Sequence, residues 1–300
     1  MGGAVNRPAD PLGKVMSLNY QALLHRHFEP RIVSYDRHDC VRFAEGFGAG
    51  QSADLQDSDQ PFLDKVNPSA LPMIAVPLAD GEFWQQDPAT GIEWQKIVHA
   101  SESIQIHRPL SCQGTVVVTE KIKDIYDRGP DKGAVMVQEQ QLLDKDNIPL
   151  ATIEVTTVLR GNGGFGGQPA PAPSPSAFPE RKADHVIDLP TPTKPDTPFR
   201  LMMDLDVAAT SNNGDAAPAV MIRGVGCFGL AGRGAIKLVC NNDPKRVRAF
   251  GVRYAGPMFT GETMRMELWE TEPGAAVFRV KSVERNTPVL KWGFIDYDAS

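Results

Sequence analysis

The sequence has few cysteines, and they are scattered along the chain without a closely spaced pair. The chain contains four, Cys40, Cys112, Cys227 and Cys240. No two of them stand as Cys-x-x-Cys, which argues against a zinc site and is typical of a protein from a reducing compartment. We therefore expect no metal.

Signals for membranes, secretion and nucleic acid are also missing. No apolar run approaches the ~18 residues that a membrane span needs. The N-terminus lacks the apolar core of a signal peptide, and the last residues are not a peroxisomal Ser-Lys-Leu tail. The net charge of −6 and the pI near 5.6 argue against nucleic acid as a general partner. These absences predict a cytoplasmic protein without a membrane or nucleic-acid partner.

The composition is that of a globular protein with room for a large core. With 300 residues, 41% hydrophobic and 23% charged, the chain can form one large or two medium domains.

One segment of the sequence occurs twice. Residues 104–118 alternate apolar and polar side chains, turn through Pro109 and Gly114, and alternate again; residues 252–266 repeat this with Pro257 and Gly261. Alternation with period two marks a half-buried strand, and Pro with Gly marks the turn between two strands. The copies are about 150 residues apart, which suggests two copies of one module.

The first half predicts an antiparallel meander. Asp36 and Asp39 mark the acidic start of a short helix, residues 50–70 are polar and irregular, and residues 71–78 are a buried segment or a short helix. The strand-like runs that follow are 93–97, 103–107, 114–125, 133–143 and 151–159.

A segment rich in Gly and Pro then separates the two halves. Residues 161–167 carry five glycines, and prolines follow at 169, 171, 173 and 175. Such a stretch is typical of a linker, and it lacks the Lys-Ser/Thr ending of a phosphate-binding loop. The predicted organisation is a loose extension at 1–17, one unit at 18–160, a linker at 161–184 and a second unit at 185–300.

The second half predicts strands around one buried helix. Residues 224–240 are small and apolar, with four internal glycines, each costing about 1 kcal/mol of helix propensity against Ala. Packing must compensate, and the small residues allow close approach of strands. The expected strands are 185–189, 248–254, 264–271, 276–284 and 290–297, and residues 199–219 are ambiguous. A sheet wrapped around a central helix is the hot-dog architecture, and two copies make an α+β double hot dog.

Short motifs along most of the chain support this architecture. They are Ile97-Val-His99-Ala-Ser-Glu102, residues 106–110, 160–167, 188–191, 199–201, 228–229 and 253–257, and Pro257-x-x-x-Gly261-Glu-Thr263. In order and spacing the chain resembles the MaoC-like dehydratases, specifically the type 2, (R)-specific 2-enoyl-CoA hydratases. The resemblance implies a double hot dog, an acyl-CoA thioester as substrate, no further cofactor, and a homodimer.

The catalytic loop of that family is altered here. The family uses an Asp and a His to hold the reacting water, in a loop whose positions fall on residues 202–209. Only Asp204 matches, since Asp206 stands at the asparagine position and Ala209 at the histidine position. A second alignment uses residues 214–218 and places Val220 at the histidine position. All six histidines lie outside residues 186–300, so the family's catalytic histidine is absent.

Other positions of the family's site are retained. The resemblance implies that the Gly224 N–H, at the start of the helix, binds the thioester oxygen, and that His99, Ala100, Arg128 or Lys132, and Tyr254 contact the acyl-CoA. Arg223 stands where the family has a histidine; it can replace the charge but not act as a base, because guanidinium stays protonated.

Each of these residues also has a structural interpretation. Tyr254 alternates with Val252 and would pack in a sheet, while His99, Arg128 and Lys132 would be ordinary polar turn residues. The basic residues Lys245, Arg246 and Arg248 would either bind the 3′-phosphate of CoA or form a plain surface patch. Asp204 and Asp206 either share a proton as a carboxylate pair or lie on a solvated loop.

Three functions remain open from the sequence. The first is an acyl-CoA hydratase/dehydratase with Asp204, Asp206 and Gly224 as catalytic residues. The second is a non-catalytic protein that binds acyl-CoA or serves as a scaffold. The third is an acyl-CoA thioesterase on the same fold.

Overall fold

The computed structural model describes residues 18–52, 55–171, 178–191, 203–209 and 219–299, with the backbone alone for 203–209. No helix among these residues is long and apolar enough to cross a membrane. The predicted extension at 1–17 lies outside the described residues.

Ten antiparallel strands form one continuous sheet. In spatial order they are β1 (Arg31–Tyr35), β3 (Gly114–Asp127), β4 (Ala134–Leu143), β5 (Pro149–Leu159), β2 (Ile97–Ile106), β9 (Val247–Tyr254), β13 (Thr287–Tyr297), β12 (Ala275–Ser282), β11 (Thr263–Glu272) and β6 (His185–Pro190). A small second sheet has the order β10 (Met258–Phe259), β8 (Ala219–Ile222) and β7 (Met203–Ala209). Nearly all strands expected from alternation are confirmed.

The two halves of the chain meet at the centre of the large sheet. β2 pairs antiparallel with β9, with Ser103 opposite Gly251. These two residues each stand one position before a copy of the sequence repeat, so the two copies are related by an approximate two-fold axis at this seam. The two sheets expected from the sequence are therefore joined edge to edge.

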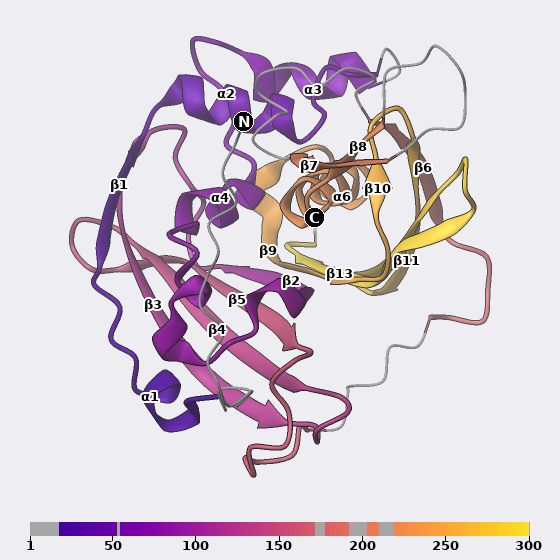
Figure 1. The fold of residues 1–300 in the computed structure, drawn as a ribbon. Coiled ribbons are helices and arrows are strands. Elements are labelled where there is room, and N and C mark those ends of the chain that lie inside the picture. The colour runs from indigo at the N-terminus through magenta and orange to yellow at the C-terminus, as the bar shows by residue number, and fades with distance from the viewer. Residues whose placement is uncertain (1–17, 53–54, 172–177, 192–202, 210–218, 300) are drawn as a thin grey trace, which may run out of the picture.

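The buried helix of the second half is confirmed. α6 (Gly224–Val239) lies inside the curve of β9, β13, β11 and β6, and Figure 1 shows it nearly end-on. The glycines of α6 make room for side chains of the first half as well as for strands. A Cβ on Gly229 would lie 1.9 Å from the ring of Phe47, and one on Gly232 would lie 2.3 Å from Met73. Side chains of the first half thus pack directly onto α6.

The first half has only short helices among the residues that the structure describes. They are α1 (Tyr20–Leu24), α2 (Arg37–Gly46), α3 (Gln56–Leu63) and α4 (Ala75–Ala79). Asp36 caps α2 as predicted, accepting the N–H of Asp39 while the Asp39 side chain accepts the N–H of Asp36. Of the two alternatives for residues 71–78, a buried segment or a short helix, the structure shows the short helix, in α4 and the preceding 3-10 turn Pro72–Ile74.

Two local expectations are wrong. Residues 50–70 contain α3, although they read as irregular. The strand expected at 93–97 is instead the 3-10 turn Trp94–Lys96, in which the N–H of Lys96 donates to Glu93 O. The three residues of this turn are exposed, so they offer no buried face for a strand.

Asp127, at the end of β3, fastens the start of the Gly-rich segment. Its carboxylate accepts backbone N–H bonds from Gly129 at 2.8 Å, Gly164 at 2.8 Å and Gly166 at 2.7 Å. The beginning of the predicted linker is therefore held on the first half.

Candidate active site at the amino end of α6

The amino end of α6 has no capping bond from its N-cap side chain. Arg223 is its N-cap residue, with an extended backbone and no capping hydrogen bond from its side chain, which is exposed. Gly224 is the first helical residue, and the first N–H groups of a helix have no carbonyl acceptor within it. These N–H groups and the positive helix end favour an anionic oxygen.

Tyr254, from the end of β9, lies directly against Gly224. A Cβ built on Gly224 would be 3.2 Å from Tyr254 Cζ and 3.3 Å from its hydroxyl oxygen. Glycine therefore lets α6 begin in contact with the phenol ring. The structure brings two of the predicted site residues together here.

His99 and Glu102, both on β2, complete the group. The Tyr254 hydroxyl donates to Glu102 Oε2 at 2.9 Å, and the rings of His99 and Tyr254 lie 4.8 Å apart. Glu102 is only 3% exposed. The Nε2 atom of His99 is buried and makes no hydrogen bond to a described residue. Four residues from both halves thus meet at the β2–β9 seam.

Burial decides the electrostatics of this group. Burial raises the pKa of Glu102, and the nearby Asp80 raises it further, against the opposing effects of His99 and of the hydrogen bond from Tyr254. The pKa of Tyr254 is raised well above 10, first by burial and then by the charge of Glu102. Both shifts favour the protonated forms.

Glu102 was missed as a site residue although it lies in a motif singled out in the sequence. It occupies an inward position of β2, in step with the buried Ile104 and Ile106. A carboxylate at an apolar position of an alternating strand is a signal in itself, because acidic residues are rarely buried without a partner.

Of the other predicted contacts, Arg128 and Lys132 lie further away. Arg128 and Lys132 are exposed on the turn before β4. Ala134 of β4 pairs with Leu159, and Leu159 pairs with Ile97, so this turn lies at the His99 end of the sheet but two strands from it. Ala100 is half-buried beside His99, at a register shift between β2 and β5. The roles of these residues stay predictions.

Asp204 and Asp206 lie on β7 rather than on a loop. The backbone of Asp204 is opposite Met221 of β8, and β8 leads through Arg223 into α6. The alternation of Met203, Leu205 and Val207 with polar or small residues explains the strand. The prediction that Asp204 and Asp206 lie on a loop is therefore wrong for the backbone. The second alignment, at residues 214–218, lies outside the described residues, and the catalytic roles stay predictions.

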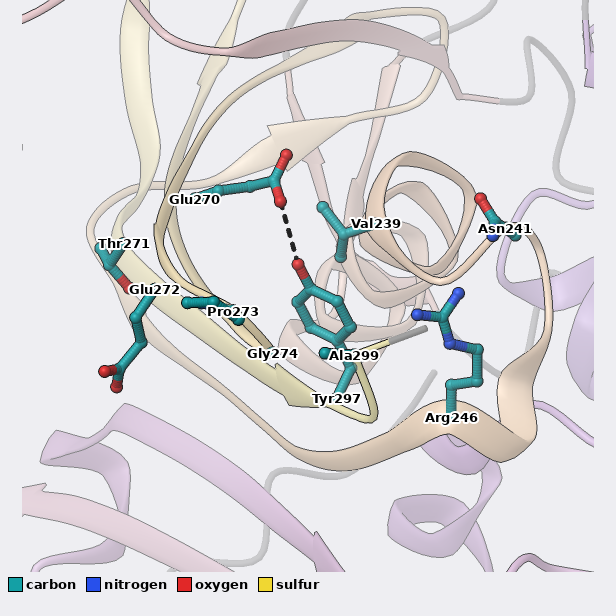
Figure 2. A pocket seen from close by; sticks show the side chains of 10 residues that line it. All are labelled: Val239, Asn241, Arg246, Glu270, Thr271, Glu272, Pro273, Gly274, Tyr297 and Ala299. Atoms are coloured by element: carbon teal, nitrogen blue, oxygen red, sulfur yellow. Dashed lines mark hydrogen bonds between the residues drawn. The ribbon is translucent and has the colours of Figure 1, made fainter.

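A separate pocket of about 400 Å³ lies at the other end of α6 (Figure 2). It includes Val239, the last residue of α6, which is roughly 22 Å from Gly224 at 1.5 Å per residue. The Tyr297 hydroxyl donates to Glu270 there at 3.1 Å, and Arg246 Nε donates to the Asp298 carbonyl at 2.9 Å. Tyr297, Glu270 and Arg246 are thus already engaged by the protein, and Gly224 is not among the residues that line the pocket.

The basic cluster after α6 is also engaged by the protein. Arg248 binds the Asp298 side chain, and Arg246 binds the Asp298 carbonyl. The surface-patch interpretation of these residues is favoured. Within the described ranges, no group of three His, Cys, Asp or Glu side chains is placed to hold a metal ion.

Comparison with known proteins agrees with this geometry. The family model of the MFE-2 hydratase 2 N-terminal domain matches residues 33–161. The 3-hydroxyacyl-thioester dehydratase Y of Mycobacterium tuberculosis is 31% identical over 267 residues, which are 84% of this chain and 88% of that protein. The chain belongs to the MaoC-like hydratase/dehydratase family.

Further relatives and a solved structure extend over the same length. Enoyl-CoA hydratase ChsH3 of M. tuberculosis is 27% identical, covering 85% of this chain and 90% of its own. The crystal structure of a MaoC-like dehydratase from Phytophthora capsici superposes with a TM-score of 0.76 at 24% identity, covering 94% of this chain and 99% of that one. The double hot dog expected from the sequence is confirmed as the fold of this family member.

Proposed function

We propose that this family member interconverts trans-2-enoyl-CoA and (R)-3-hydroxyacyl-CoA thioesters by adding or removing water. The observation that carries the proposal is the uncapped amino end of α6, where Gly224 offers a backbone N–H beside the partly buried Tyr254. Full-length similarity to a 3-hydroxyacyl-thioester dehydratase supports the same chemistry. No cofactor takes part, and CoA enters as part of the substrate.

The reaction needs three elements. A water loses a proton and adds to C3, the electrons of the double bond move towards the thioester oxygen, and a proton is added at C2. Fixed N–H donors stabilise the oxyanion, and each such donor is worth about 10²–10³ in rate. Gly224 and the positive end of α6 supply this part.

The base in this proposal is Asp204. An isolated aspartate has a pKa near 3.9 and is a weak base at neutral pH. A like charge at Asp206 would raise the pKa of one of the two carboxylates, so that they share a proton. The pair then replaces the Asp–His combination of the family.

Hydration of crotonyl-CoA, followed by the loss of enoyl absorbance, tests the proposal. The wild-type protein should consume the enoyl thioester, and Asp204→Asn should reduce the rate by at least about 100-fold. Arg108→Gln, which alters an exposed ion pair with Asp144, is the control and should leave the rate unchanged. An Asp204→Asn rate equal to that of the wild type would refute the role of Asp204.

A second candidate is a non-catalytic protein that binds acyl-CoA. The absence of any histidine from residues 186–300 favours it. Thermal stabilisation by butyryl-CoA without consumption of crotonyl-CoA would select this candidate, since a ligand that binds only the folded state raises its stability. Release of free thiol in the same assay would indicate a thioesterase instead.

We also propose that the protein acts on fatty acyl chains as a cytoplasmic homodimer. All four cysteines are free, which fits a reducing compartment. Light scattering of the purified protein tests the dimer, and a mass of 32.7 kDa would contradict it.

A further inference from the structure

We infer that Tyr254 is a further catalytic residue of this site, whose hydroxyl donates a second hydrogen bond to the thioester oxygen, and that Glu102 orients it. The inference rests on the proposed function. It assigns a role to Glu102, and it makes the seam between the two halves part of the reaction centre.

The positions of the groups carry the inference. The Tyr254 hydroxyl lies 3.3 Å from the point where a Cβ of Gly224 would be. It is therefore close enough to the first N–H of α6 for one acceptor oxygen to bond to both donors. The side chain of the N-cap residue Arg223 makes no capping hydrogen bond, so it does not compete for this place.

Glu102 determines which way the tyrosine proton points. Its Oε2 lies 2.9 Å from the Tyr254 hydroxyl oxygen, the residue is 3% exposed, and it forms no salt bridge with a Lys or Arg that the structure describes. A protonated carboxyl would donate to the phenol oxygen, which frees the phenol O–H to donate towards the ligand. An ionised carboxylate would instead hold the phenol proton for itself.

The surroundings raise the pKa of Glu102 and so favour its protonated form. The ionisable groups that face the pair are His99 on β2, Asp80 after α4, and Cys227 on α6. Burial and Asp80 raise the pKa of Glu102 despite His99. A carboxylic acid kept neutral in an apolar site, donating beside a tyrosine, is an established way to stabilise an oxyanion.

The step balances without net proton loss from either residue. The base takes a proton from water, the C3–O bond forms, and negative charge moves onto the thioester oxygen. Gly224 N–H and Tyr254 O–H stabilise that charge. The proton then returns to C2 from the base, the carbonyl re-forms, and Tyr254 and Glu102 keep their protons.

The test uses cinnamoyl-CoA, a chromophoric enoyl thioester whose absorbance shifts to the red when its carbonyl is polarised. Binding to the wild-type protein should produce this shift without any need for turnover. Tyr254→Phe keeps the ring against Gly224 and His99 but removes the hydroxyl. It should lose most of the shift, and kcat for crotonyl-CoA should fall about 10²–10³-fold with a smaller change in KM.

Glu102→Gln is the variant that separates orientation from packing. Its amide donates to the phenol oxygen at every pH, as the protonated acid does. The red shift should therefore persist in Glu102→Gln at high pH, where the wild-type protein loses it. Tyr35→Phe is the matched control, since Tyr35 is a buried phenol of the first half whose hydroxyl donates to Ser111 O. It should change neither the spectrum nor the rate.

Each outcome of these experiments supports or overturns the role of Tyr254. An unchanged red shift in folded Tyr254→Phe would overturn the inference and leave the proposed function intact. A shift that depends on Tyr254 in a protein without turnover would uphold the inference and remove the hydratase activity. Failure of the wild-type protein to bind the probe would overturn both. Circular dichroism of each variant establishes that it is folded, and Glu102→Gln gives an independent readout if Tyr254→Phe is not.

Discussion

Gly229 has no Cβ, and this allows the two halves of the molecule to pack against each other. A Cβ at this position would lie 1.9 Å from Phe47 Cδ1, and the Phe47 ring is fully buried. We expect Gly229→Ala to lower the free energy of unfolding by about 2 kcal/mol, because overpacking outweighs the ~1 kcal/mol gain in helix propensity. Urea unfolding followed by circular dichroism measures the change.

The neighbouring Gly232 provides the control for that substitution. A Cβ there would meet the flexible end of Met73, which can move aside. Gly232→Ala should therefore cost less than Gly229→Ala. In a Phe47→Leu background the cost of Gly229→Ala should shrink, which a double-mutant cycle detects. Equal costs in both backgrounds would mean that the ring of Phe47 is not the obstacle.

Asp127 gives the chain a predictable response to acid. Burial alone would raise its pKa, but N–H groups of Gly164, Gly129 and Gly166 together lower it below the usual value. A depressed folded-state pKa stabilises the protein above the unfolded value, near pH 4, and that contribution disappears as the pH falls through the folded value.

Asp127→Ala should therefore weaken the Gly-rich segment at neutral pH and matter little in strong acid. Hydrogen exchange at the amides of Gly129, Gly164 and Gly166 measures this directly. We expect faster exchange in the variant at pH 7, and the relative difference from the wild-type protein should narrow below about pH 3. A difference that stays constant across this range would contradict the role of the charge.

At the scale of elements, an ion pair buried at 2–3% side-chain exposure joins α6 to α3. Arg233 Nη1 donates to Asp59 Oδ1 at 2.8 Å and Oδ2 at 3.0 Å, and its Nε donates to Phe47 O at 3.1 Å. Asp59→Ala should reduce the free energy of unfolding by about 3–5 kcal/mol, because it leaves the guanidinium buried without its counter-charge. Chemical denaturation measures the loss.

The reverse experiment separates the charge from the packing. Asp59→Ala combined with Arg233→Met removes both charges and should cost less than Asp59→Ala alone. Glu154→Gln, which alters an exposed pair with Lys123, should cost at most about 1 kcal/mol. A double variant as unstable as Asp59→Ala would show that the ion pair is not what fastens α6 to α3.

The elements that sequence could predict are those with a local signal. Alternation defined the strands, and the small residues with internal glycines defined α6. α3 was missed because residues 56–61 are polar and include Pro61. It depends on contacts that are distant in sequence, namely the burial of Phe62 and the pairing of Asp59 with Arg233.

The same limit applies to the site. Gly224 could be predicted as a site residue, because its sequence motif and its place at the start of a predicted helix are both local signals. The partnership of Glu102 with Tyr254 could not, because it depends on the pairing of β2 with β9. An interaction across 152 residues leaves no spacing signal in the sequence.

At the scale of the whole molecule, the two halves share one hydrophobic core. A single cluster of buried residues includes Phe47 and Met73 from the first half and Phe228 and Phe250 from the second. β2 and β9 continue the sheet across the boundary, and α2 and α3 lie over α6 in Figure 1. Each half therefore lacks part of its own packing when it is alone.

This arrangement predicts that fragments 18–160 and 185–300 depend on each other for a rigid fold. In isolation, fragment 185–300 would expose the face of α6 that Phe47 and Met73 cover and would leave Arg233 without Asp59. We expect each fragment alone to bind a hydrophobic dye and to lack a near-ultraviolet circular dichroism signal, and the mixture to regain that signal. Arg233→Met in fragment 185–300 removes the unpaired charge and should improve solubility without restoring the signal. Cooperative unfolding of either fragment by itself would show that the predicted units are independent domains, and the seam that carries Glu102 and Tyr254 would then be a contact between preformed halves.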